Sequence, residues 1–308
     1  MRGAIATKQS RFKNGIASLP LVARNDAVHL SSCPNFSLAT TLTSGQVFRW
    51  REVSPGGFAG WINSSLVEIT QKGPELSFRG ASPKVIGRFF SLDVDLPSLT
   101  RRIDVDPIIH QAIQSHWGLR LIRQDPWECT ASFILSSFNN IPRLTGMLET
   151  LAVKFGESVE AAGPLFYRFP TAERLAKVSE RVLRNCGLGF RAPYLRAAAQ
   201  RVAGGAADLE RWRSLEDEAL RRSLLTIPGI GEKVVECVLL FGYGRAAAFP
   251  VDVWIGRTMR AWYFRRRKVT DRRIREFARA HFGAQCGWAQ QYLYCYARTT
   301  AAESFLTA

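Results

Sequence analysis

A lysine and an aspartate in the stretch 225–257 are the residues of this sequence best suited to covalent chemistry. Lys233 follows the turn Pro228-Gly229-Ile230-Gly231 and lies in the first turn of a helical run that begins at Glu232. Because the positive end of a helix dipole disfavours a cation, this lysine does not serve helix stability. The same dipole and partial burial favour its neutral amine, which is the form that nucleophilic catalysis by lysine requires.

Asp252 is the second candidate catalytic residue. It stands in Pro250-Val251-Asp252-Val253, after an apolar run and before a new helical pattern, so we expect it to be the N-cap of a helix. Taken singly, Lys233 is ordinarily a solvated helix lysine, and Asp252 is ordinarily a plain cap worth about 1 kcal/mol. A capping carboxylate is held in place and can also face a reaction centre, so the two roles of Asp252 are compatible.

The turn before Lys233 predicts a phosphate-binding site. Gly229 and Gly231 flank one apolar residue and allow a hairpin tight enough to leave the first N–H groups of the next helix exposed. Those N–H groups and the positive helix end together favour an anion such as phosphate. The preceding segment 215–226 is amphipathic, so the pattern is that of two helices joined by a short hairpin.

The composition indicates a polyanionic partner. The 308 residues carry a formal net charge of +16, and each phosphate neutralised on duplex DNA would add about 0.9 to the salt slope of binding. Origin in an arginine-rich proteome could also produce this charge. Six scattered cysteines without C-x-x-C pairs argue against a structural zinc site and a disulfide scaffold. No apolar run is long enough to cross a membrane.

The elements that must position these residues begin with a predicted sheet. Short β-branched or aromatic runs between Asn35 and Arg79 are separated by turns rich in glycine, proline and asparagine, which is typical of antiparallel strands. The predicted strands are Phe48–Trp50, Phe58–Ile62, Ser65–Thr70 and Glu75–Arg79.

Helical spacing replaces this pattern in the rest of the chain. It begins with Pro83–Phe90 and Asp106–Trp117, and further helices are expected to start at Asp125, Pro142 and Thr171 and to stop at Gly156, Gly187 and Gly204-Gly205. The predicted fold class is α+β, with an N-terminal antiparallel β-sheet domain packed on a mostly α-helical domain.

Three segments are expected along the chain. Residues 1–28 are expected to form a basic, disordered tail, residues 29–121 the β-rich domain, and residues 122–308 the helical domain with the hairpin and the catalytic segment. Residues 1–28 would also fit a transit-like leader, or a start codon placed upstream of the true one.

Together the motifs resemble a known family of DNA repair enzymes. The hairpin, the lysine just after it and the later Pro250-Val251-Asp252 resemble the helix–hairpin–helix glycosylases of base-excision repair. The segments that further resemble the 8-oxoguanine DNA glycosylases are Ser44–Trp50, Arg123–Cys129, Asn139–Met147, Gly187–Ala192 and Gly287–Gln290. The resemblance implies that Lys233 attacks the anomeric carbon of the sugar and forms a Schiff base that permits β-elimination. It implies that Asp252 stabilises the developing positive charge on the sugar.

The resemblance also implies a pocket that reads an extruded base. Its residues would be Gly45, Cys237, Phe241, Gln290 and Tyr294. The carbonyl of Gly45 would accept the N7 proton that distinguishes 8-oxoguanine from guanine, because glycine lets the backbone approach the base. Gln290 would donate and accept along the Watson–Crick edge. Cys237 and Tyr294 would sandwich the base; a small core residue and a core aromatic are their ordinary alternatives.

Further positions are implied for the rest of the DNA. Those assigned to the opposite base and the wedge are Phe138, Asn139, Arg143, Phe190 and Arg191, and those assigned to DNA phosphate are Gly229, Gly231 and Trp254. The two arginines would donate to the orphaned cytosine, and Phe190 would be the wedge. Where the family usually has three asparagines this chain has Phe138-Asn139-Asn140, so stacking would replace a hydrogen bond and loosen the selectivity for cytosine. Trp254 and Ala297 also depart from the family, which usually has histidine and often aspartate there.

The leading hypothesis is therefore a bifunctional DNA glycosylase and AP β-lyase that excises 8-oxoguanine, preferably opposite cytosine, from duplex DNA. One alternative is a glycosylase for another damaged purine; alkyl-base glycosylases generally lack the lysine, so Lys233 disfavours that version. The other is a non-catalytic helix–hairpin–helix DNA-binding protein, which the presence of both Lys233 and Asp252 disfavours.

No cofactor is expected to be required and no catalytic metal is implied. The carbonyls of Leu225, Ile227 and Ile230 could hold a monovalent cation that bridges to a DNA phosphate, as in relatives. The expected partner is double-stranded DNA containing an oxidised purine, with no membrane association and with the protein as a monomer. The location would be the cytoplasm and nucleoid of a bacterium, or the nucleus or mitochondria of a eukaryote.

Overall fold

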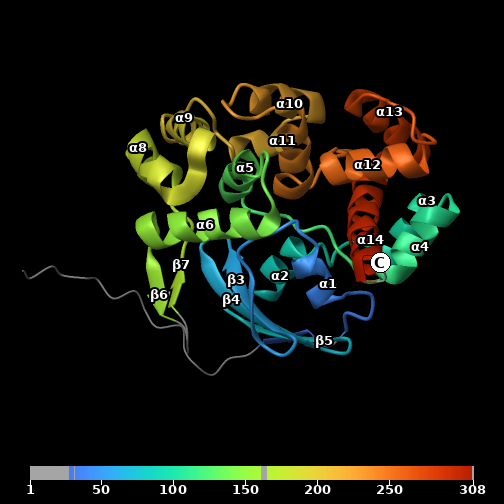
Figure 1. Ribbon diagram of the computed structural model, residues 1–308. Helices are drawn as coiled ribbons and strands as arrows, with labels where there is room; N and C mark the ends of the chain where they lie inside the picture. Colours follow the sequence, from blue (N-terminus) through green and yellow to red (C-terminus); the bar gives the residue numbers. More distant parts are fainter. Residues whose placement is uncertain (1–27, 31, 161–164, 307–308) are drawn as a thin grey trace, which may run out of the picture.

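A computed structural model describes residues 28–30, 32–160 and 165–306 (Figure 1). A twisted sheet lies at one side of the molecule and most of the helices lie at the other, with the long α6 (Ile141–Phe155) running between the sheet and part of the helical domain. This is the α+β arrangement that the sequence predicts. The expected tail lies outside the described residues except for Val28.

The N-terminal sheet has five antiparallel strands in the order β1-β5-β4-β3-β2. The strands are β1 (Val28–Leu30), β2 (Arg51–Ser54), β3 (Gly57–Ile62), β4 (Ser65–Lys72) and β5 (Glu75–Arg79). The strand β3 is buried along its whole length, and β5 alternates between buried and exposed residues because only one of its faces packs on the core. Gly56 and Gly73, both in left-handed conformations, make two of the turns.

Three of the four predicted strands are confirmed and one is wrong. Phe48–Trp50 is not a strand, because Arg49 turns inward there: its guanidinium lies 3.0 Å from the Glu128 carboxylate and donates to the carbonyl of Tyr167. The segment therefore joins the sheet to the helical domain. A helix, α1 (Leu38–Thr43), also stands where strands were expected, with the hydroxyl of Ser37 accepting from the N–H of Thr40 as its N-cap.

The remainder is helical apart from one small hairpin, β6 (Ser158–Glu160) with β7 (Leu165–Tyr167), which the sequence patterns did not predict. The α-helices before the hairpin are α2 (Pro83–Phe89), α3 (Leu96–Ile103), α4 (Pro107–Ser115), α5 (Pro126–Leu135) and α6; those after it are α7 (Ala172–Ala176), α8 (Glu180–Leu183), α9 (Ala192–Ala203), α10 (Asp217–Leu225), α11 (Glu232–Cys237), α12 (Val253–Trp262), α13 (Asp271–Phe282) and α14 (Cys286–Leu306). Shorter helical turns are η1 (Arg184–Leu188), η2 (Gly189–Arg191), η3 (Arg211–Ser214), η4 (Val238–Gly242) and η5 (Gly283–Gln285).

The predicted helix boundaries follow real caps. Asp125 and Thr171 are N-caps whose side chains accept from backbone N–H groups, and Gly156 and Gly204 are C-caps. The start predicted at Pro142 falls one residue inside α6, which is capped by Asn140. No helix among the described residues has the length and apolar character that crossing a membrane would need.

The largest hydrophobic core lies in the helical domain around α11 and α14. Buried residues of α3 and α4, such as Leu96 and Ile109, belong to this core and not to the one beneath the sheet. The N-terminal sequence thus contributes two helices to the support of α14, which carries two of the predicted pocket residues.

Candidate active site

The hairpin between α10 and α11 has the geometry that its glycines predict. Gly229 has φ of +87°, and a Cβ there would lie 2.7 Å from Cβ of Tyr194, so both conformation and space require glycine. Gly231 is the N-cap of α11, and a Cβ on it would meet open space. The mouth of α11 is therefore unobstructed at the point where its N–H groups could receive a phosphate.

Lys233, the second residue of α11, directs its amine toward the end of α5. Its Nζ donates to Oγ of Ser136 over 2.7 Å, and Oγ of Ser136 donates in turn to the carbonyl of Phe133 over 2.7 Å. The same Nζ lies 5.4 Å from the centre of the Phe133 ring. In Figure 1 α5 lies directly beside α11. The half-buried amine is thus held by one hydroxyl above an aromatic face, and it has no carboxylate within ion-pairing distance among the residues that the structure describes.

Asp252 is the N-cap of α12, as predicted. One carboxylate oxygen accepts from the N–H of Ile255 over 2.8 Å. Burial raises the pKa of the Asp252 carboxyl above its ordinary value, and the N–H of Ile255 and the charge of Lys233 lower this pKa in part. The pKa effect shows that the field of the amine reaches the carboxylate. The amine of Lys233 and the carboxyl of Asp252 are therefore near enough for their charges to interact.

Gly45 is fixed from both sides. The carbonyl of Ser44 accepts from Nε2 of Gln291 over 3.0 Å, and the buried amide of Gln46 bonds to the carbonyl of Arg120 and the N–H of Ile122. Gly45 itself has φ of +82°, and a Cβ on it would come within 3.3 Å of the Tyr294 ring. The structure therefore brings Gly45 of the sheet domain against Tyr294 of α14, although 249 positions separate them in sequence.

Gln290 carries a polar atom that the fold leaves unpaired. Its Nε2 donates to the carbonyl of Pro250 over 3.3 Å, two residues before Asp252. Its Oε1 is buried and has no hydrogen-bond partner among the described residues. Because a buried acceptor without a donor is costly, this oxygen marks a place where a bound group would supply the donor.

Cys237 and Phe241 follow Lys233 along one helical run. Burial raises the pKa of the Cys237 thiol to about 12, although the charge of Lys233 lowers it in part, so the thiol is neutral and packs as an apolar group. Phe241 stacks on Phe133 with ring centres 5.5 Å apart. The sequence predicts that Phe241 lines the base pocket; in the structure it is buried and stacks on the Phe133 ring, over which the lysine amine lies.

Two phenylalanines project from the surface at the predicted wedge. Phe138 is 93% exposed with φ of +50°, and Phe190 is 49% exposed; their ring centres are 6.2 Å apart, edge to face. A left-handed conformation costs a non-glycine residue about 1–2 kcal/mol, and exposure of a whole phenylalanine adds an unfavourable hydration term. Something must hold Phe138 in this position.

Arg191 supplies that support. Only 3% of it is exposed, and its guanidinium donates to the carbonyls of Ser137 over 2.7 Å and Phe138 over 2.8 Å while lying 4.4 Å above the Phe190 ring. In this structure its donors face the protein's own loop, and not the surface where the sequence predicts a contact with the opposite base. Burial and the nearby charge of Arg143 both lower the pKa of Arg191.

The other residues predicted to contact DNA fall into two groups: one is bonded within the protein and the other is exposed. Nδ2 of Asn139 donates to the carbonyl of Leu135, and its Oδ1 accepts from the N–H of Asn140, so this amide holds the α5–α6 connection. Arg143 is exposed, and in the described part of the chain its guanidinium has no hydrogen bond or ion pair. Trp254 is 41% exposed on the first turn of α12. Arg143 and Trp254 are therefore the ones available to an external partner.

Two residues of this site escaped the sequence patterns. Ser136 and Phe133 come from the end of α5, about 100 positions before Lys233, and nothing in their local sequence distinguishes them from ordinary helix residues. The one indication of their role in the sequence is that they stand two and five residues before Phe138, which is itself a predicted DNA contact.

The chain is similar to known proteins along most of its length. Residues 30–130 match the family described as "8-oxoguanine DNA glycosylase, N-terminal domain", and residues 131–282 match "HhH-GPD superfamily base excision DNA repair protein". A "Probable N-glycosylase/DNA lyase" of Methanothermobacter thermautotrophicus is 31% identical over 86% of this chain and 94% of that protein. The "N-glycosylase/DNA lyase OGG1" of Arabidopsis thaliana is 30% identical over 84% of this chain and 76% of that protein.

A solved structure extends this likeness to three dimensions. The Clostridium acetobutylicum 8-oxoguanine glycosylase/lyase, in complex with double-stranded DNA containing cytosine opposite 8-oxoguanine, superposes with a TM-score of 0.86. It is 32% identical in sequence, and the match covers 90% of this chain and 97% of that one.

Proposed function

The chain belongs to the 8-oxoguanine DNA glycosylase family of helix–hairpin–helix base-excision repair proteins, and we propose that it works through a Schiff base on Lys233 and prefers cytosine opposite the lesion. It is an N-glycosylase with DNA lyase activity that acts on 8-oxoguanine in duplex DNA. The observation that carries the mechanism is the Lys233 amine, held by Ser136 at the mouth of α11 within the field of the Asp252 carboxylate.

In the proposed reaction the neutral amine of Lys233 forms a bond to C1′ of the deoxyribose. The bond from C1′ to N9 of the base breaks, its electron pair leaves with the base, and the base takes up a proton. The carboxylate of Asp252 stabilises the positive charge that develops on the sugar as this bond lengthens. The amine then loses one proton to water, the bond from C1′ to O4′ breaks as the nitrogen lone pair forms a double bond to C1′, and O4′ takes up a proton, which gives a protonated imine. A base then takes a proton from C2′, a double bond forms between C2′ and C3′, and the C3′–O bond breaks so that the 3′ phosphate leaves, which is β-elimination.

Recognition of the base rests on two groups of the pocket. The carbonyl of Gly45, fixed between Ser44 and Gln46, accepts the N7 proton of 8-oxoguanine, where guanine would present a lone pair. The unpaired Oε1 of Gln290 accepts a proton from the Watson–Crick edge. Rejection of guanine follows because its N7 lone pair would face the Gly45 carbonyl without a proton between them.

Cytosine opposite the lesion is read by Arg143 in this proposal. Its exposed guanidinium offers donors that suit N3 and O2 of an unpaired cytosine, whereas the donors of Arg191 hold the loop that carries Phe138. Phe138 and Phe190 enter the space left by the extruded base and stack on its neighbours. Since stacking tolerates every base, the preference for cytosine is expected to be modest.

Borohydride trapping tests the mechanism. The protein is incubated with duplexes carrying 8-oxoguanine, guanine or an alkylated purine, and borohydride reduces any imine to a stable protein–DNA adduct. We expect an adduct with the 8-oxoguanine duplex alone, and none from Lys233→Gln. An adduct with the alkylated purine alone would favour the second substrate class, and DNA binding without any adduct would favour a passive binding module.

Phe138→Asn tests the proposed opposite-base contact. Asparagine tolerates the left-handed conformation of this position and replaces stacking by hydrogen bonding. Excision rates with each of the four opposite bases should show a sharper preference for cytosine than the parent protein. An unchanged ratio across the four bases would refute the role given to Phe138.

A monovalent cation at the hairpin is a further part of the proposal, and the reaction itself needs no redox cofactor. Leu225 is the last residue of α10, so its carbonyl lacks an intrahelical donor, and the carbonyl of Ile227 accepts one turn N–H from Ile230 and keeps a second lone pair. These carbonyls fit a cation site. Exchange of potassium for a bulky organic cation at fixed ionic strength should weaken DNA binding; binding that does not change argues against the site.

A further inference from the structure

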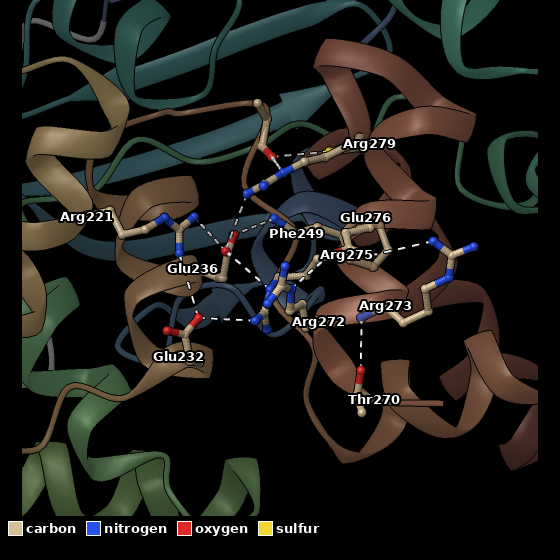
Figure 2. Close-up of polar contacts among 12 residues, drawn as sticks. Arg221, Glu232, Glu236, Phe249, Thr270, Arg272, Arg273, Arg275, Glu276 and Arg279 are labelled. Atoms are coloured by element: carbon tan, nitrogen blue, oxygen red, sulfur yellow. Dashed lines mark hydrogen bonds and ion pairs between the residues drawn. The ribbon is translucent and has the colours of Figure 1, made fainter. Parts of the chain in front are cut away.

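A buried carboxylate lies on the same helix as the catalytic lysine. Glu236 of α11 is 0% exposed and follows Lys233 by three residues. A buried charge is stable only when the protein itself supplies its partners. Figure 2 shows the Glu236 side chain enclosed by arginines from two other helices and by the backbone of Phe249.

One oxygen of Glu236 receives the charges. Its Oε1 lies 2.6 Å from Arg221 of α10, 3.7 Å from Arg275 and 3.6 Å from Arg279, both of α13. Arg275 is further paired with Glu232 at 3.1 Å. This oxygen therefore anchors α11 to α10 and α13 through long side chains, which can adjust when their partner moves.

The other oxygen has a different kind of partner. Oε2 of Glu236 accepts from the backbone N–H of Phe249 over 2.8 Å, and Phe249 precedes Asp252 by three residues. Among the described residues it is the one hydrogen bond that joins the backbone of the segment 246–252 to α11. A backbone N–H cannot extend toward a displaced acceptor as an arginine side chain can.

We propose that Glu236 is a positioning residue of the reaction, which sets the place of Asp252 relative to Lys233 through the N–H of Phe249. The inference rests on the roles that the proposed function gives to these two residues. Lys233 and Glu236 share one rigid helix, so the bond to Phe249 transmits the position of the lysine to the segment that ends in Asp252. The arginines neutralise Glu236 and fix the helix. The hydrogen bond from the N–H of Phe249 sets the distance between Lys233 and Asp252.

Two conservative variants separate the two oxygens. Glu236→Gln keeps an oxygen for the N–H of Phe249 but removes the charge from the arginines. We expect it to lower the urea midpoint of unfolding while single-turnover excision of 8-oxoguanine stays within about threefold of the parent rate, because the position of Asp252 is kept. Glu236→Asp keeps the charge but withdraws the carboxylate by one methylene. We expect a midpoint closer to the parent value and excision slower by about tenfold or more, since a shift of about 1 Å in a reacting group can cost a hundredfold.

The control is Val235→Ala, which removes buried volume from the same helix and lowers stability without touching the carboxylate. Its excision rate should equal the parent rate at temperatures where both are folded, and the Kd for 8-oxoguanine DNA should stay within about twofold in all three variants because the hairpin is unchanged. Equal slowing by Glu236→Gln and Glu236→Asp, a parent rate in Glu236→Asp, or slowing by Val235→Ala would overturn the positioning role. A parent protein that releases no 8-oxoguanine would refute the proposed function itself.

Discussion

Polar groups around two residues of α11, Glu236 and Lys233, are treated in opposite ways. On the side of Glu236, every carboxylate oxygen has a partner, and the partners come from three other segments. On the side of Lys233, the amine has one hydroxyl, the carboxyl of Asp252 has a raised pKa, and the buried Oε1 of Gln290 has no donor within the described residues. A satisfied network rigidifies a fold, whereas unsatisfied groups are places where a ligand gains binding energy. The same helix thus takes part in a structural cluster of polar groups around Glu236 and a reactive cluster around Lys233.

Among changes in the reactive cluster around Lys233, Asp252→Asn should have the largest effect on the reaction rate. Loss of the charge that faces the developing cation is expected to slow single-turnover excision by about 10²–10³. The same change should stabilise the protein at neutral pH, because asparagine also caps a helix and the folded state disfavours the ionised carboxyl.

The sign of that stability effect can be checked against pH. The pKa of Asp252 is raised in the folded protein, so its ionisation costs stability once the pH exceeds the ordinary value of 3.8. The gain in urea midpoint of Asp252→Asn over the parent should therefore be absent below pH 3.8, grow as the pH rises, and be complete at pH 7. An equal difference in urea midpoint below pH 3.8 and at pH 7 would contradict the conclusion that burial raises the pKa of this carboxyl.

Arg221→Met tests the structural cluster around Glu236. It removes the shortest contact of Glu236, and breaking a buried ion pair typically costs about 3–5 kcal/mol. We expect a loss of about 2 kcal/mol in the free energy of unfolding by urea, because Arg275 and Arg279 remain. Arg222→Met, at the exposed neighbouring position, is the matched control and should change stability by less than about 0.5 kcal/mol. Equal losses in the two variants would mean that the ion pair with Glu236 adds no more to the free energy of unfolding than an exposed arginine does.

Two adjacent glutamines of α14 repeat the contrast on a smaller scale. Nε2 of Gln291 donates to the carbonyl of Ser44, whereas Oε1 of Gln290 is unpaired. Gln290→Leu removes the donor to the Pro250 carbonyl but also removes a buried acceptor that has no partner, so it should lower the urea midpoint less than Gln291→Leu does. It should slow 8-oxoguanine excision about tenfold, because one ligand hydrogen bond is lost. Gln291→Leu should lower the midpoint, since it leaves the Ser44 carbonyl without its donor. Reversed effects on stability would refute this assignment of the two side chains.

Ser136→Ala should give the smallest effect. The hydroxyl of Ser136 holds the Lys233 amine, and a hydrogen bond of about 0.5–1.5 kcal/mol corresponds to a two- to tenfold slower borohydride-trapping rate. Ser137→Ala is the neighbouring control and should trap at the parent rate. A parent rate in Ser136→Ala would show that Phe133 and the helix alone position the amine.

Local patterns predicted the parts of the site that depend on neighbouring residues. The hairpin glycines, the start of α11 before Lys233 and the capping role of Asp252 are each encoded within a few residues, and all three are present in the structure. The helix caps at Asp125 and Thr171 were predictable for the same reason. The strand predicted at Phe48–Trp50 was wrong because a distant carboxylate on α5 draws Arg49 away from the sheet.

The sequence by itself thus determined which residues can perform chemistry and which turns and caps present them. Only the tertiary structure decided which of them meet, as Lys233 meets Ser136 across 97 positions and Glu236 meets the N–H of Phe249 across 13. It also turned Arg191 toward the loop of Phe138 and left Arg143 for the solvent. A hydrogen bond between distant segments leaves no mark on the residues beside it in sequence, because its energy depends on a geometry that exists only after the chain has folded.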